Sequence, residues 1–143
     1  MIAVAQALIL NWAHRTFGQV ALSRLERAAR LFEEAAEVAQ AAGVSEEMCG
    51  RILKRTYSRP VGNVVQELGG CAVTLLAMCE VTGNSFEAVL KQEVDRCIER
   101  GPSFAAKHAE KVRDGTANVY SLAKSTILWP ESPRGDGPNK DEK

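Results

Sequence analysis

The chain has 143 residues, of which 45% are hydrophobic and 25% charged, as in an average globular domain. Its length suits one domain. Eighteen basic and eighteen acidic residues give a net charge of zero, which argues against a protein that holds nucleic acid through a broad basic surface. Aromatic residues make up only 6%, so we expect a mostly aliphatic core.

Hydropathy and cysteine usage indicate the compartment. No uninterrupted stretch of about 18 apolar residues occurs, so we expect no helix to span a membrane. The four cysteines form no CxxC pair and have no histidine at zinc spacing, and a domain of this size does not need a disulfide scaffold. We therefore expect reduced, mostly buried thiols in a cytoplasmic protein.

The periodicity of the first forty residues is helical, because apolar residues recur at three- and four-residue steps and β-branched alternation is not sustained. We expect helices over residues 2–12 and about 21–42, the second ended by Gly43 as a C-terminal cap. The positions predicted to share one buried stripe on that second helix are Leu22, Leu25, Ala29, Phe32, Ala36 and Ala39.

Four further helices are expected, three of them opened by serine N-caps and one by a proline at its first position. The expected starts are, in chain order, Ser45, Pro60, Ser85 and Ser103. The last three end at about residue 82, at Gly101–Pro102 and at about residue 113.

These elements predict an all-α domain over residues 1–113, with four or five core helices, and a C-terminal extension over 114–143. Within the extension, residues 119–129 have enough apolar content to dock on the body. Residues 130–143 contain three prolines, two glycines and seven charges, a composition that predicts disorder from about residue 130.

The fourth helix is apolar nearly all round, since between Leu68 and Cys79 only Thr74 has a polar side chain. Such a helix needs cover on several sides. Gly69 and Gly70 lie in mid-helix, where each costs roughly 1 kcal/mol relative to alanine, and this indicates a close approach by another backbone or a ligand. Because the chain has few helices to cover this surface, we expect a homodimer or homotetramer.

A cluster of carboxylates on the second helix has the chemistry of a metal site. Glu33, Glu34 and Glu37 form an EExxE pattern, and Glu34 and Glu37 are spaced so that their carboxylates can converge on one point. Oxygen-only ligands suit Mg²⁺. The alternative is a solvated acidic face that offsets Arg27 and Arg30 one turn earlier.

Glu67 opens the most apolar stretch of the chain. A charge beside such a surface needs a partner, and a metal shared with Glu34 and Glu37 would provide one. The alternative is a first-turn glutamate that serves the helix N-terminus, although Glu67 lies about two turns beyond Pro60.

The two acidic segments, RAARLFEEAAE at 27–37 and QELGGCAVTLL at 66–76, resemble the all-α nucleotide pyrophosphohydrolases of the MazG-like type. The likeness covers roughly residues 12–113. The signature of that family is ExxE followed, two to three dozen residues later, by ExxD. The positions that match are Glu34, Glu37 and Glu67, while Gly70 stands where ExxD has its aspartate.

The resemblance implies Mg²⁺-dependent hydrolysis of a nucleoside triphosphate to the monophosphate and pyrophosphate, with Mn²⁺ as an alternative ion. Glu34, Glu37 and Glu67 would hold the metal, and Glu33 would orient or deprotonate the attacking water. The loss of the ExxD aspartate at Gly70 implies a divergent branch of the family.

Two residues are candidate substrate contacts. Trp12 precedes the long helix and can stack on a base, the alternative being packing in the core or at an interface. Arg59 lies in a loop, where it can bind a phosphate with two hydrogen bonds; the alternative is an ordinary surface arginine.

The favoured hypothesis is therefore a nucleotide pyrophosphohydrolase, with a nucleotide as its ligand and no nucleic-acid or membrane partner. Gly70 supports a competing hypothesis, a catalytically silent MazG-like module that binds a nucleotide or a protein partner. A third is a structural oligomer without a ligand.

Overall fold

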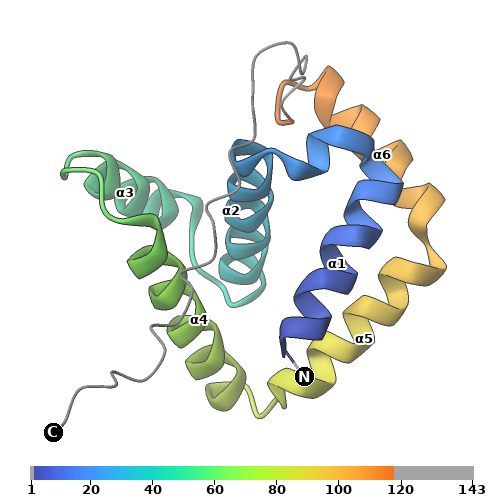
Figure 1. Ribbon diagram of the computed structural model, residues 1–143. Helices are drawn as coiled ribbons and strands as arrows, with labels where there is room; N and C mark the ends of the chain where they lie inside the picture. The colour runs from blue at the N-terminus through green and yellow to red at the C-terminus, as the bar shows by residue number, and fades with distance from the viewer. Residues whose placement is uncertain (1, 118–143) are drawn as a thin grey trace, which may run out of the picture.

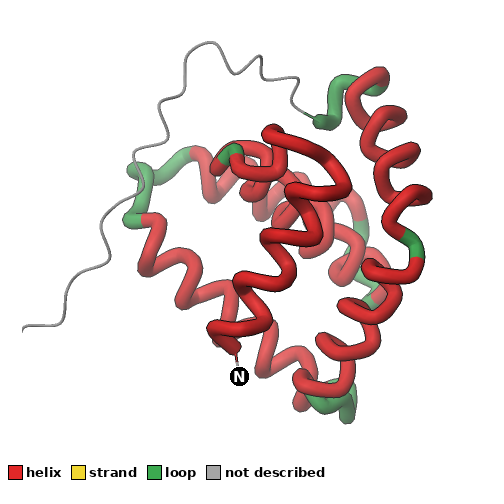
Figure 2. The backbone as a smooth tube through the Cα atoms, turned by 45° about the vertical axis from the view of Figure 1, so that its right-hand side comes forward, coloured by secondary structure: helices red, strands yellow, loops and turns green. Residues whose placement is uncertain are grey.

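The computed structural model describes residues 2–117, and these form α-helices and one 3-10 turn with no strand among them (Figures 1 and 2). The all-α prediction is confirmed. The elements are α1 (Ile2–Phe17), η1 (Gly18–Leu22), α2 (Arg24–Ala41), α3 (Glu46–Tyr57), α4 (Val64–Val81), α5 (Phe86–Glu99) and α6 (Gly101–Arg113).

The helices lie on two sides of α2, with α1, α5 and α6 on one side and α3 and α4 on the other (Figure 1). On the first side α1 packs against α5 and α6, and η1 connects α1 to α2. On the second side α3 packs against α2, whereas α4 makes at most isolated contacts with the other described helices. The closed four- or five-helix bundle thus stays a prediction.

Capping side chains set several helix ends as the sequence indicates. Ser45 and Ser85 accept hydrogen bonds from the backbone N–H groups three residues ahead and cap α3 and α5. Gly43 ends α2 in the left-handed region, with φ of +87°. The N–H groups of Gly43 and Val44 donate to the carbonyls of Gln40 and Ala39, which is the Schellman arrangement that favours glycine.

Four predicted boundaries are wrong. α1 extends to Phe17, and α2 begins only after the N-cap Ser23. α4 begins at Val64 instead of Pro60, because the Asn63 side chain accepts the N–H groups of two first-turn residues and forms the stronger cap. The remaining difference is at α6, which begins at Gly101, so that Ser103 lies inside its first turn.

The buried interior is small. Among residues 2–117 the buried positions are Ala13, Ala21, Glu26, Cys79 and Ala117. The predicted stripe of α2 is largely uncovered, with Leu25 50% and Phe32 60% exposed, because α3 covers only part of it. All four cysteines are free, as expected, but only Cys79 is buried.

Glu26 is fully buried in the first turn of α2. Its backbone N–H donates to Ser23 Oγ at 3.4 Å, and its Oε1 lies 3.1 Å from Arg30 Nε and 3.8 Å from His108 Nδ1. Since His108 belongs to α6, this carboxylate connects α2 to α6. A buried carboxylate needs such cationic and hydrogen-bonding neighbours.

The end of the described chain returns to α2. Arg30 donates a hydrogen bond to the Thr116 carbonyl, and Ala117 is buried. The predictions of docking for residues 119–129 and of disorder from about residue 130 lie outside the described residues.

By length and composition α4 is able to cross a membrane, contrary to the expectation from uninterrupted apolar runs. The search for uninterrupted apolar runs did not find α4, because single polar residues interrupt the apolar sequence of this helix. The same composition occurs in helices that are covered by protein, so the finding by itself does not assign α4 to a membrane.

Replacing Glu26 with alanine should lower the free energy of unfolding by about 3 kcal/mol, because it leaves Arg30 and His108 around a site without its carboxylate. Urea unfolding followed by circular dichroism measures the change. The matched control is Glu47→Ala, which removes an exposed i,i+4 partner of Arg51 and should leave stability nearly unchanged. Equal effects of the two variants would contradict the role given to Glu26.

Candidate metal and nucleotide site

Glu33 is the most firmly held of the three clustered glutamates. Its Oε2 accepts a hydrogen bond from Lys111 Nζ at 2.7 Å and another from Arg30. Lys111 belongs to α6, so Glu33 forms a second connection between α2 and α6. Both cations neutralise the carboxylate, and Lys111 is thereby positioned beside the predicted metal ligands.

Glu34 carries the electrostatic signature of a crowded acidic site. Partial removal of its carboxylate from water raises its pKa, and the negative charges of Glu37, Glu33 and Glu93 raise it further, while Lys111 opposes them. Glu93 lies on α5, so α5 adds a fourth carboxylate that the sequence analysis did not select. A cation placed here would relieve this mutual repulsion.

Glu93 is itself paired on α5. Its carboxylate accepts hydrogen bonds from Arg96 Nε at 2.7 Å and from the Cys97 thiol at 3.6 Å. The hydrogen bond from Arg96 is the main reason why the pKa of Glu93 is lowered, and the bond from Cys97 lowers it further. Arg96 also stacks over the Phe104 ring, 4.9 Å from its centroid. The α5 face toward α2 therefore has a cation as well as an acid.

Glu67 does not join this group within one chain. It lies in the first turn of α4, and its carboxylate folds back against Gly62, where an added Cβ would collide with it. This position fits the alternative given for Glu67, a first-turn glutamate whose negative charge is favourable at the N-terminus of its helix. The start of α4 at Val64 removes the two-turn offset that counted against the helix-terminus alternative.

The site has the right type of donor atom for a metal ion, but one chain does not bring enough of these donors together. The carboxylates of Glu34 and Glu37 are oxygen donors of the kind that Mg²⁺ takes. Among residues 2–117, however, no three side chains of the ligating types lie close enough together to hold a metal ion.

The two candidate substrate residues occupy different settings. The Trp12 ring packs edge-on against Phe17 and Phe104, with centroids 5.5 and 5.6 Å away, which is the packing alternative for this residue. Arg59 is exposed in the segment between α3 and α4. The structure does not bring Arg59 into the Glu34 group.

Sequence reasoning did not select Glu93, Arg96 and Cys97, and it left Lys111 outside the site. Their positions follow from how α5 and α6 pack against α1 and against each other, and no motif on either helix marks them. The one sequence signal is the alternation of acidic and basic residues at helical spacing over 91–96, which is also typical of an exposed helix face.

In comparisons with known proteins, no family model, no curated protein and no solved structure matches this chain. The resemblance to the MazG-like enzymes therefore stands on its two motifs alone.

Burial and the neighbouring Glu93 raise the pKa of the Cys97 thiol to about 11. Because the thiolate is the reactive species, alkylation of Cys97 should keep accelerating as pH rises toward 11. The pH at which the alkylation rate is half of its maximum is the midpoint. Glu93→Gln removes a negative charge beside the thiol and should lower this midpoint. Peptide-resolved mass spectrometry of alkylation rates measures both midpoints.

The control for this prediction is Glu99→Gln, which removes a carboxylate at the end of the same helix. It should leave the Cys97 midpoint in place. A Cys97 midpoint near 9 in the native chain, or equal shifts in the two variants, would contradict the α5 arrangement.

Proposed function

We propose that this protein is a Mg²⁺-dependent nucleoside triphosphate pyrophosphohydrolase that acts in the cytoplasm as a homo-oligomer and releases a nucleoside monophosphate and pyrophosphate. The observation that carries the proposal is the gathering of Glu33, Glu37 and Glu93 around Glu34, whose pKa is raised first by partial burial and then by these negative charges. A protein does not gather like charges at one place without an energetic penalty, and perturbed acids are frequent at functional sites.

Glu34 and Glu37 are the proposed primary ligands. Glu67, the third ligand that the second motif implies, lies apart from them within residues 2–117. When bound there, Mg²⁺ or Mn²⁺ neutralises phosphate charge and lowers the pKa of a coordinated water. Glu33 would orient that water. Its bonds to Arg30 and Lys111 hold its carboxylate in one orientation, which is what a positioned base needs.

The cations around the group suit a polyphosphate. Lys111 reaches the acidic face of α2 from α6, and Arg96, which pairs with Glu93 on α5, contributes its charge near Glu34. An ammonium and a guanidinium on two sides of a metal-binding carboxylate pair would hold the phosphates of a nucleotide. Trp12 and Arg59 stay proposed contacts for the base and a phosphate.

Glu37→Gln should abolish Mg²⁺-dependent pyrophosphate release from a panel of nucleoside triphosphates. We expect a loss of at least about 100-fold in kcat/KM, because even the outer partners of metal ligands contribute 10- to 100-fold. Glu47→Gln, which removes an exposed glutamate of α3, is the matched control and should retain full activity. Unchanged turnover in Glu37→Gln would refute the mechanism.

Gly70 favours a second candidate function, a catalytically silent module that binds a nucleotide or a protein. Within the described residues of one chain an aspartate has room at this position, because apart from the backbone of α4 no atom lies within 4 Å of where a Cβ would be. If pyrophosphate release appears only in Gly70→Asp, the native chain is a binding protein. Release by the native chain would exclude this candidate.

A further inference from the structure

The helix α4 is uncovered along almost its whole length. Only 6% of Val64–Val81 is buried, and the cover is confined to the last turn, where Cys79 is buried and Met78 half-buried. We use the name α4 surface for six exposed side chains on this helix. They are Val64, Val65, Leu68, Val73, Leu75 and Leu76.

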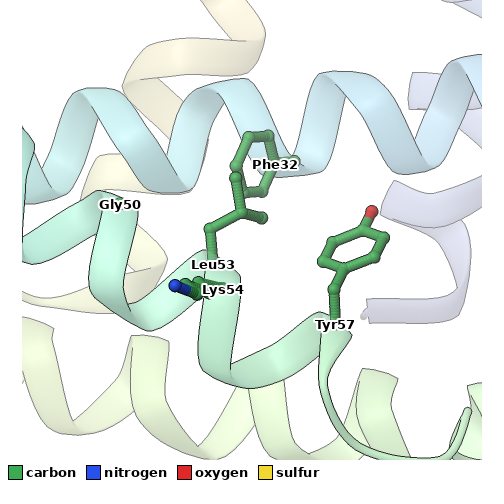
Figure 3. A pocket seen from close by; sticks show the side chains of 5 residues that line it. All are labelled: Phe32, Gly50, Leu53, Lys54 and Tyr57. Atoms are coloured by element: carbon green, nitrogen blue, oxygen red, sulfur yellow. The ribbon is translucent and has the colours of Figure 1, made fainter.

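An apolar groove lies next to this surface, between α2 and α3 (Figure 3). Phe32 from α2 and Leu53 from α3 point toward each other, and Tyr57 stands at the end of the groove (Figure 3). Tyr57 is 84% exposed. One chain therefore presents both an uncovered apolar helix, with the α4 surface spread around half of it, and an apolar groove.

The exposed apolar area is of the size that a stable interface requires. A bare Val or Leu side chain presents on the order of 100 Å² of apolar surface. At the observed exposures the α4 surface and the groove together present on the order of 500 Å². In a standard interface each partner buries about 800 Å², a little over half of it apolar.

We propose that the α4 surface and the α2–α3 groove form the interface between two copies of this chain. Having the apolar helix and the groove on one chain meets the condition for a two-fold contact, in which each copy supplies both halves. The chain also has a net charge of zero, so two copies do not repel one another. This inference supplies the interface of the homo-oligomer in the proposed function, and it does not depend on the hydrolytic activity.

The mid-helix glycines of α4 fit a close approach by another copy. Apart from the backbone of α4 itself, no atom of residues 2–117 lies within 4 Å of a Cβ built at Gly69 or at Gly70. Glycine is unfavourable inside a helix, so two adjacent glycines without a neighbour in the described part of the chain are consistent with a helix that another copy approaches. Small residues let two helix backbones approach closely.

A lipid bilayer is the less favoured cover. The groove beside α4 includes the ammonium of Lys54, and α3 carries a Glu47–Arg51 ion pair on its exposed surface. The α4 segment itself includes Glu67 and Glu80. Such charges suit the rim of a protein interface and are costly in hydrocarbon.

Sedimentation equilibrium of the full chain tests the proposal. We expect a mass of at least twice 15.5 kDa for the native protein. Val73→Glu introduces a charge where the native side chain is 68% exposed in one chain, so it should leave the helical circular dichroism intact and shift the mass to that of one chain. Ile98→Glu, on α5 at 65% exposure, is the matched control and should keep the native mass.

A measurement on the native chain makes the test independent of any variant. Cys71 is exposed on α4 in one chain, so its alkylation should slow as protein concentration rises through the dissociation constant. A native mass of 15.5 kDa at about 100 μM, or a native mass retained by Val73→Glu, would overturn the proposal.

Two outcomes would identify another occupant and overturn the proposal equally. A monomeric protein that pellets with phosphatidylcholine–phosphatidylglycerol vesicles would assign α4 to a membrane. A monomeric protein whose Cys71 is protected at every concentration would assign the cover to the chain's own residues 118–143. Because neither readout uses a nucleotide, failure here is distinguishable from failure of the proposed enzymatic function.

Discussion

The buried carboxylate of Glu26 determines how α2 is placed against the rest of the molecule. It is the one charged side chain in the small buried interior of residues 2–117, and it faces Arg30 on its own helix and His108 on α6. Removing a carboxylate from water is favourable only with cationic neighbours in fixed positions. This requirement sets both the rotation of α2 and the distance of α6 from it.

The arrangement of the candidate site follows from that placement. Glu33 lies two turns along α2 from Glu26, on the same side of the helix, and therefore also faces α6, where it binds Lys111. Glu34 is rotated toward α5 and meets the charge of Glu93. Two of the clustered glutamates therefore differ in their neighbours. Glu33 is paired with two cations, whereas Glu34 lies mainly among other carboxylates.

The other half of the molecule obeys a different constraint. α3 and α4 have well-formed caps and local hydrogen bonds, yet α4 has almost no tertiary cover. Local capping is sufficient to define where a helix begins and ends, but a helix that is apolar on all sides gains its stability from burial. Among residues 2–117 that burial is missing, and the second motif of the candidate site, at Glu67, lies on this same uncovered helix.

The sequence by itself determined what depends on neighbours within one turn. It defined the all-helical class, the serine caps of α3 and α5, and the stop at Gly43, because each rests on bonds between residues two to five apart. It also identified Glu34 and Glu37 as an acidic pair. Only the tertiary structure decided that Glu26 is buried, that Glu93 and Lys111 reach the pair, that Trp12 packs against Phe104, and that Glu67 points back to Gly62. Those outcomes depend on contacts between helices far apart in the chain, and helical periodicity specifies a face without specifying what covers it.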